Sequence, residues 1–207
     1  MGLVGGSKIS SKIDLLKALV TKLDRLALGG ALANTFLFAR GWNIGASYYE
    51  KQLAKTALEI ERLAHAEQCE ILLPVDVIVA RDLEPDALFF VRRMGEVEDG
   101  ERILDVGPET LARLQHAMKI SATFIWNGPI GVFETAPFDR GTVDLARTAA
   151  KMTRRGNLIS VAGGGDTVSA LNHAGVAADF TFVSTAGGAF LEWVGGPILP
   201  GVAVLMD

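Results

Sequence analysis

Short runs of apolar residues alternate along the chain with longer segments in which apolar residues recur every three or four positions. The short runs are rich in Val, Ile and Leu, which is typical of strands buried on both faces of a sheet. They predict strands at residues 26–28, 71–73, 75–80, 103–106, 123–126, 158–162 and 180–183. The longer segments predict helices at residues 10–23, 31–40, 48–66, 108–118, 139–152, 166–174 and 187–194. This alternation predicts an α/β fold with a mainly parallel sheet and helices on both faces.

Residues 83–100 interrupt the alternation. They contain Pro85, several acidic residues and nearly all of the stretch FFVRRMGEVEDGE, which ends at Glu101. We interpret this segment as an antiparallel excursion, after which the main sheet resumes.

Glycines gather where the apolar runs end. The segments concerned are GGSK at 5–8, LGGALANTF at 28–36, DVGPET at 105–110, WNGPIGVFE at 126–134, AGGGDT at 162–167 and STAGGA at 184–189. A single glycine at such a junction is usually a cap or a tight turn. In open α/β sheets, however, ligands bind outside the carboxyl ends of the strands. The set of junctions on one edge therefore predicts a binding rim.

The residues in these segments favour an anionic ligand. A helix that begins near Asp166 would direct its free N–H groups and the positive end of its dipole outward, with the Thr167 hydroxyl beside them. Asp166 is also a good N-cap residue, which is the purely structural interpretation. Lys8 and Lys12 are four residues apart and would share one face of the first predicted helix. Phosphate would explain this pair, although solvated surface lysines are the usual interpretation.

Composition narrows the possible functions. The formal net charge is −4 and the isoelectric point is about 5.4, which argues against a general nucleic-acid binder. The single cysteine, Cys69, excludes an internal disulfide and a multi-cysteine zinc site, and it fits a reducing cytoplasm. The first residues contain no long apolar segment, so we expect no signal peptide and no membrane span. The chain has neither a P-loop motif nor G-x-G-x-x-G, so a nucleotide would be bound by another arrangement.

Several motifs of the sequence together resemble those of one protein family. GGSKISSKI, GGALANTFL, LPVDVIVA, DVGPET, WNGPIGVFE, AGGGDT, STAGGAFLE and LPGV occur in an order and approximate spacing similar to those of the C-terminal, nucleotide-binding domain of phosphoglycerate kinase. The resemblance covers nearly all of residues 1–207. It implies a Rossmann-like, three-layer α/β domain of a glycolytic kinase that transfers a phosphoryl group between 1,3-bisphosphoglycerate and ADP, with Mg²⁺. The N-terminal, phosphoglycerate-binding domain of that family is absent from the sequence.

The resemblance also implies roles for individual residues. Lys12 matches the lysine that follows the transferred phosphoryl group, and Gly187 and Gly188 match the start of a helix that stabilises its charge. Asp166 matches the magnesium contact. The remaining positions match residues that bind the nucleotide: Lys8 and Asn127 at the phosphates, Gly164, Gly165 and Thr167 at the phosphate-binding helix, Glu134 at the ribose, and Gly6, Gly29, Gly30, Leu73 and Leu104 around the adenine.

Two departures from the family pattern fall in the predicted site. Ala31 and Ala186 stand where the family has glycines, and each adds a methyl group near the expected nucleotide. We expect a cytoplasmic monomer that binds adenine nucleotide, with no nucleic acid or membrane partner, and that is inactive without the missing domain. The alternative is a stand-alone domain that binds or senses adenine nucleotide without catalysis. A dinucleotide-dependent oxidoreductase is disfavoured because its glycine fingerprint is missing.

Overall fold

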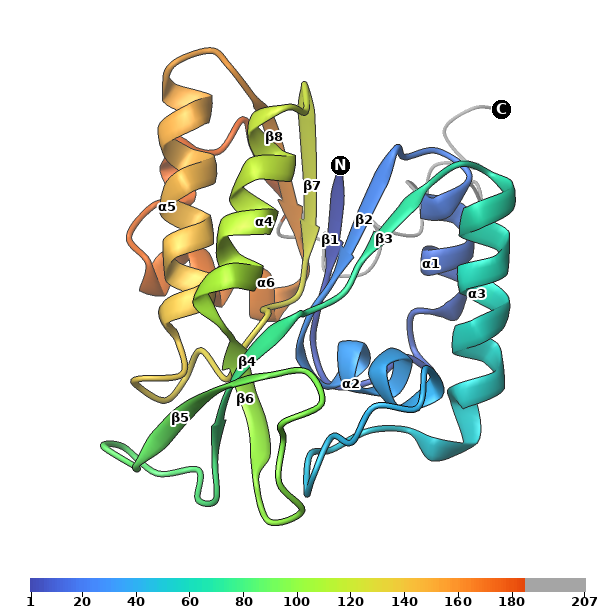
Figure 1. Ribbon diagram of the computed structural model, residues 1–207. Helices are drawn as coiled ribbons and strands as arrows, with labels where there is room; N and C mark the ends of the chain where they lie inside the picture. Colours follow the sequence, from blue (N-terminus) through green and yellow to red (C-terminus); the bar gives the residue numbers. More distant parts are fainter. Residues whose placement is uncertain (185–207) are drawn as a thin grey trace.

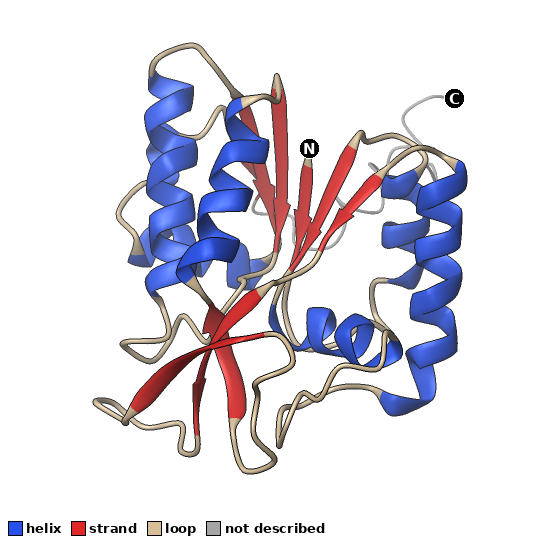
Figure 2. Ribbon diagram, viewed as in Figure 1, coloured by secondary structure: helices blue, strands red, loops and turns tan. Residues whose placement is uncertain are grey.

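The computed structural model describes residues 1–184, which form a parallel sheet between two layers of helices (Figures 1 and 2). The sheet has six strands in the order β3-β2-β1-β7-β8-β9, and each neighbouring pair is parallel. Its strands are β1 (Gly2–Val4), β2 (Arg25–Leu28), β3 (Glu70–Leu72), β7 (Thr123–Asn127), β8 (Ile159–Gly163) and β9 (Phe182–Ser184). The predicted α/β class is confirmed.

The helices cover the two faces of this sheet in two groups. They are α1 (Ile13–Val20), α2 (Gly30–Ala39), α3 (Ala54–Ala66), α4 (Pro108–Lys119), α5 (Arg140–Arg154) and α6 (Gly165–His173). Helices α1, α2 and α3 contribute to one apolar cluster, and α4, α5 and α6 contribute to the other. This arrangement is the three-layer architecture that the alternating pattern predicts.

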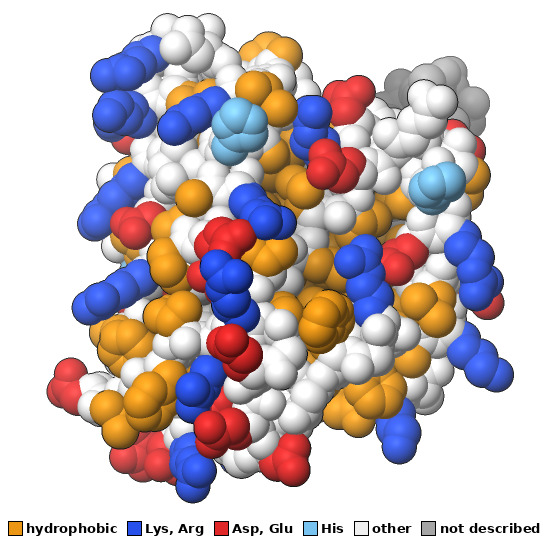
Figure 3. All heavy atoms as spheres, in the orientation of Figure 1, with side chains coloured by type: hydrophobic (Ala, Val, Ile, Leu, Met, Phe, Trp, Pro, Cys, Tyr) orange, Lys and Arg blue, Asp and Glu red, His pale blue; other side chains and the backbone are white. Residues whose placement is uncertain are grey.

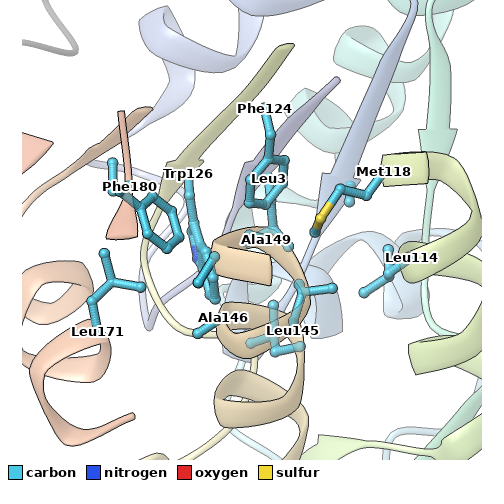
Figure 4. Packing of buried hydrophobic residues seen from close by; sticks show 14 of the residues in the cluster. Leu3, Leu114, Met118, Phe124, Trp126, Leu145, Ala146, Ala149, Leu171 and Phe180 are labelled. Carbon is cyan, nitrogen blue, oxygen red and sulfur yellow. The ribbon is translucent and has the colours of Figure 1, made fainter. Parts of the chain in front are cut away.

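Successive side chains of the central strand β1 contribute alternately to the two apolar clusters. Leu3 belongs to the cluster of α4, α5 and α6, whereas the next residue, Val4, belongs to the cluster of α1, α2 and α3. Successive side chains of a strand point to opposite faces, so a strand covered on both sides is apolar throughout. Figure 4 shows Phe124 and Trp126, both fully buried, packed with residues of α5 such as Leu145.

A second, smaller sheet lies beside the first and corrects one prediction. Strands β4 (Asp76–Ala80), β5 (Phe89–Arg93) and β6 (Arg102–Val106) form an antiparallel sheet in the order β5-β4-β6. The antiparallel excursion is therefore real. The expectation that the main sheet resumes at residue 103 is wrong, because β6 pairs with β4. The short helical turns η1 (Lys51–Leu53) and η2 (Ala177–Asp179) complete the described elements.

Several element boundaries differ from the prediction. The most important omission is β1, which has only three residues and lies at the centre of the main sheet. The predicted helix 10–23 is shorter in the structure, since α1 spans Ile13–Val20. The predicted helix 48–66 likewise begins at Ala54, after the turn η1. The predicted helix 187–194 lies outside the described residues. In the part of the chain that the structure describes, no helix has the length and apolar character needed to cross a membrane.

Candidate functional site

The strand order locates the candidate site. The chain moves outward from β1 to β3, returns to β7, and then moves outward in the other direction to β9. The order thus reverses between β1 and β7, which lie side by side in the middle of the sheet. Ligands of open α/β sheets bind outside the carboxyl ends of the strands at such a switch point. A ligand site is therefore expected at the segments that follow Val4 and Asn127.

Backbone hydrogen bonds join the loops that leave β1, β2 and β7. The Gly5 N–H donates to the carbonyl of Asn127 over 2.8 Å, and the Gly6 N–H donates to that of Pro129 over 3.0 Å. The Gly30 N–H donates to the carbonyl of Ile130, also over 3.0 Å. These three loops, which are far apart in the sequence, therefore form one bonded unit at the edge of the sheet.

Close backbone approach explains why this unit is rich in glycine. A Cβ atom on Gly5 would overlap the carbonyl of Pro129, and one on Gly29 would lie 2.5 Å from a methyl carbon of Ile130. Gly30 has a φ of +63° and would place a Cβ 2.7 Å from the carbonyl oxygen of Gly6. Side chains at these positions would force the loops apart. Contact between the loops is therefore sufficient to require these glycines.

Lys12 directs its ammonium group into the same unit. It is the N-cap residue of α1, and its Nζ donates to the carbonyl oxygen of Gly5 over 2.5 Å. Ideal Cβ positions on Gly6 and Gly128 lie 3.3 and 3.0 Å from Nζ, so the ammonium lies between the loops after β1 and β7. Burial lowers the pKa of Lys12 to about 8, and the charge of Asp166 partly opposes this shift. No other hydrogen bond or ion pair of this ammonium falls within residues 1–184.

Thr167 joins α6 to the loop after β7. Its hydroxyl donates to the carbonyl of Gly163 over 2.8 Å and accepts from the N–H of Gly128 over 2.7 Å. The residue is 1% exposed. The sequence places this hydroxyl at a bound phosphate, but in the structure its one donor proton is engaged by the protein.

Asn127 carries an unused acceptor at the same place. Its side-chain N–H donates to the carbonyl of Gly163 over 2.7 Å, which fixes the orientation of the amide. Its Oδ1 is buried and has no hydrogen-bond partner within residues 1–184. A buried acceptor that lacks a donor is costly, so such a group points to a bound water, cation or ligand.

The start of α6 is open, unlike the unit of joined loops. Gly164 is its N-cap residue, with a φ of +99°, and no side chain caps the helix among the described residues. The interpretation of Asp166 as an N-cap is wrong, because Gly164 is the N-cap residue and Asp166 is the second residue of the helix. A Cβ on Gly165 would meet no described atom within 4 Å. The first N–H groups of a helix attract anions, so this end is available to one.

Asp166 is the carboxylate nearest to this helix start in the sequence. It is exposed and makes no hydrogen bond or ion pair within residues 1–184, although its charge acts on Lys12. No group of three or more His, Cys, Asp or Glu residues in the described part of the chain is arranged to hold a metal. Magnesium is commonly held by one or two carboxylates, waters and the phosphates of the substrate. The available residues fit a Mg²⁺ ion of that kind and no all-protein metal cage.

Two further predicted site residues, Leu104 and Glu134, lie on other segments. Leu104 is buried against Ala80 and Phe138, and its carbonyl accepts a hydrogen bond from the N–H of Val132. Glu134 is exposed in the connection from β7 to α5. Its carboxylate makes no hydrogen bond or ion pair to any residue in 1–184.

Two further predictions look different in the structure. Lys8 is exposed and precedes α1, so it shares no helical face with Lys12. Leu73 lines a groove together with Trp42 and Pro74, and the loops after β1, β2 and β7 do not border that groove. Gly187 and Gly188 lie outside the described residues.

One predicted junction does not belong to this edge. DVGPET begins with the last two residues of β6 in the second sheet, and a Cβ on Gly107 would overlap the Asp76 carboxylate. That carboxylate accepts from the N–H of Glu109 over 2.9 Å and from that of Thr110 over 2.7 Å. This glycine is therefore explained by the start of α4. Sequence reasoning also gave no role to Asp105, which is quoted in this motif and is buried in the structure.

Charges are mixed on one face of the molecule. On the face drawn in Figure 3, Lys and Arg side chains gather at the outer side of α5, and acidic side chains gather near the loops of the second sheet. The described surface on this side offers no uniform field to attract an anion. Local groups such as the Lys12 ammonium and the start of α6 must therefore hold any anionic ligand.

These observations define the class of the domain. It is an open α/β sheet with helices on both faces, and at its switch point a partly buried lysine lies beside an uncapped helix N-terminus. Anionic ligands are bound at such places in α/β proteins.

Comparison with known proteins identifies the family. The sequence pattern of the family described as "Phosphoglycerate kinase" matches residues 1–197. The chain belongs to the phosphoglycerate kinase family, which is a family of phosphotransferases. The structure of phosphoglycerate kinase from Coxiella burnetii superposes with a TM-score of 0.94 at 44% identity, covering 99% of this chain and 52% of that one. The enzyme from Pyrococcus horikoshii gives 0.80 at 25% identity, covering 99% and 51%.

Curated relatives agree with this assignment. The phosphoglycerate kinase of Caulobacter vibrioides (strain NA1000 / CB15N) is 60% identical over 205 residues, covering 99% of this chain and 52% of the relative. That of Rhodopseudomonas palustris is 56% identical over the same shares. The chain therefore spans about half the length of the curated relatives it matches.

Proposed function

We propose that the chain is the C-terminal, nucleotide-binding half of a phosphoglycerate kinase, and that it binds MgADP and MgATP at the switch point between β1 and β7. In the complete enzyme this half would take part in phosphoryl transfer between 1,3-bisphosphoglycerate and ADP. The observation that carries the proposal is the partly buried Lys12 ammonium beside the uncapped start of α6. A desolvated cation and a helix N-terminus together favour a polyphosphate.

Lys12 is proposed to follow the phosphoryl group during transfer. Its ammonium has three donors, and only the bond to the Gly5 carbonyl occupies one of them within residues 1–184. The other donors are available to phosphate oxygens. Such a group acts by position and charge, which is the main contribution of proteins to phosphoryl transfer.

The metal and the nucleoside are assigned to other residues. Asp166 would hold Mg²⁺ together with the phosphates, and the ion would neutralise their charge. Glu134 would accept hydrogen bonds from the ribose hydroxyls, since its carboxylate is exposed and engages no other described residue. The glycines at 6, 29 and 30, with Leu73 and Leu104, would border the adenine, and Gly187 and Gly188 would stabilise the transferred group.

We expect the chain alone to bind nucleotide without turnover. The other half of the relatives is proposed to hold phosphoglycerate, so that residues 1–207 alone lack the positioning that contributes roughly 7 to 11 kcal/mol to such reactions. The partners are then the adenine nucleotide and that other half, in a cytoplasmic, monomeric enzyme. A stand-alone nucleotide sensor is the alternative. It would show no turnover even when the N-terminal domain of a relative is added.

Calorimetric titration of the purified chain tests the proposal. The chain should bind ADP, and more tightly with Mg²⁺ than without it. Asp166→Ala should weaken MgADP by about tenfold and metal-free ADP by less than about threefold, because the carboxylate acts through the ion. Asp82→Ala, which replaces an exposed aspartate in the loop between β4 and β5, is the matched control and should change neither affinity. Failure of the unmodified chain to bind ADP, or equal losses with and without Mg²⁺, would contradict the proposal.

A further inference from the structure

The connection from β7 to α5 carries Glu134 and is held by the end of β6. The N–H of Val132 donates to the carbonyl of Leu104 over 2.8 Å. Phe138, near the other end of the connection, is fully buried in a cluster with Leu104 and Ala80. The segment that presents Glu134 thus folds around the last residues of β6.

Asp105 lies inside this fold. Its side chain is 2% exposed. One carboxylate oxygen accepts from the N–H of Val106 over 2.8 Å, and the other accepts from the N–H of Gly141 over 2.7 Å. Gly141 is in the first turn of α5, whose own N-cap residue, Asp139, makes no capping hydrogen bond. Asp105 therefore supplies from β6 the acceptor that the helix start lacks.

Two glycines make room for this carboxylate. A Cβ on Gly131 would overlap Asp105 Oδ1, and one on Gly141 would lie 2.5 Å from the same atom. These glycines flank the segment that contains Glu134, one on each side. The carboxylate thus contacts both ends of the connection at once.

We propose that Asp105 is a positioning residue of the nucleotide site, which fixes residues 131–141 and so places Glu134 against the ribose. This inference rests on the proposed function, because Glu134 is the ribose ligand only if the chain binds a nucleoside. Asp105 itself touches no nucleotide, since it is buried beneath the connection. Its effect falls on the nucleoside and not on the phosphates, which bind near Lys12 and α6.

Calorimetry with two probes separates these effects. Asp105→Asn should weaken MgADP by about tenfold and magnesium pyrophosphate, which has no ribose, by less than twofold. Asp144→Asn is the matched control, because it removes an exposed charge of α5 that acts on Asp105 and leaves the hydrogen bonds in place. It should change neither affinity. Equal losses for both probes would overturn the proposal, since they would indicate general damage to the fold.

A double-mutant cycle tests the route through Glu134. If Asp105 acts by placing that carboxylate, Asp105→Asn should cost less than about twofold in a Glu134→Gln background, against tenfold in the unmodified chain. Additive losses would contradict the proposed route.

Hydrogen exchange on the unmodified chain tests the two hydrogen bonds to Asp105 without any substitution. The amides of Val106 and Gly141 should be protected, the latter although it lies in the first turn of a helix. Exchange of both at the rate of an open loop would overturn the proposal, even if ADP binds. Protection of both amides without any ADP binding would instead leave the connection as described and refute the nucleotide-binding function.

Discussion

Two glycine-rich regions of the same edge differ in what surrounds their glycines. In the loops after β1, β2 and β7, neighbouring backbone or side-chain atoms exclude a Cβ at Gly5, Gly29 and Gly30. At the start of α6, a Cβ on Gly165 would meet no described atom. The first set is required by the fold. No contact within residues 1–184 requires Gly165, so a ligand that approaches this helix start is the explanation we propose for its missing side chain.

This difference between the two regions changes how the glycine-rich rim is interpreted. A loop glycine is often interpreted as room for a ligand, yet most of this rim is accounted for by contact between loops. The ligand-binding argument rests instead on groups that the fold leaves unused. These are the free donors of Lys12, the Oδ1 of Asn127 and the N–H groups at the start of α6. The packed loops hold these groups in place and need not touch the ligand everywhere.

The largest expected effect is at the packed loops. Gly5→Ala should lower the free energy of unfolding by about 3 kcal/mol or more, because the new methyl group would overlap the Pro129 carbonyl and separate two hydrogen-bonded loops. Urea denaturation of the variant and the unmodified chain measures the difference. Gly2→Ala at the start of β1 is a milder comparison, since its Cβ would meet the flexible end of the Leu23 side chain first. Unchanged stability of Gly5→Ala would remove the distinction between the two regions.

The sequence predicts the part of this edge that depends on short-range patterns. Alternating apolar runs give the α/β class, and glycines after those runs mark the loops that meet at β1, β2, β7 and β8. It could not reveal β1 itself, because three residues at the start of the chain are too few to show a period. Nor could it assign β4 and β6 to a second sheet. Buried strands have the same apolar composition whichever partner they pair with.

The misjudged site residues have a similar cause. Asp166 has the right type for an N-cap, but Gly164 has a positive φ and is the N-cap residue, so that the helix already begins at Gly165. Asp105 has no local signal at all, because the N–H of Gly141 that it accepts from lies 36 residues away. A contact across the fold decides the role of Asp105, and the backbone conformation of Gly164 decides that of Asp166; no sequence period records either.

A second prediction concerns the pH dependence of stability. It rests on Asp105, which is buried in closely packed surroundings like the glycines of the joined loops. Burial raises the pKa of Asp105 to about 7, the negative charges of Asp139 and Asp144 add to the shift, and the N–H groups of Gly141 and Val106 oppose it. The unfolded chain ionises this group near pH 4, so the folded state holds the extra proton between about pH 4 and 7. The contribution to stability is therefore complete at low pH and is lost as the pH rises through 7.

The measurement compares unfolding free energies of the unmodified chain and Asp105→Asn from pH 5 to pH 8. The difference between them should change by about 2 to 3 kcal/mol over this range, with the unmodified chain losing stability as the pH rises. Every other titrating group is common to both proteins and cancels. A difference that stays constant with pH would show that Asp105 titrates normally and is less buried than described.

The third prediction addresses the open region directly. Gly165→Ala should leave the free energy of unfolding unchanged or slightly raised, because alanine favours a helix and the new Cβ meets no described atom. It should weaken MgADP by about tenfold, since the methyl group would occupy the approach of the phosphates to α6. Ser169→Ala, one turn further along α6 and exposed, controls for changes in the helix itself. Full affinity in Gly165→Ala would place the phosphates elsewhere.

The smallest expected effect is the uptake of a fraction of a proton when MgADP binds. It arises at Lys12, where the two regions meet. Burial lowers the pKa of this ammonium to about 8 although Asp166 opposes the shift, so that about half of the molecules carry it uncharged at pH 8. Bound phosphates should restore the charge, and MgADP binding should then take up about half a proton at pH 8 and almost none at pH 6.5. Calorimetry in two buffers of different ionisation enthalpy measures this uptake. Lys12→Met should abolish it, whereas Lys17→Met, on an exposed face of α1, should not. Binding without proton uptake at pH 8 would mean that the phosphates do not reach the ammonium, and the packed loops and the open helix start would then not form one site.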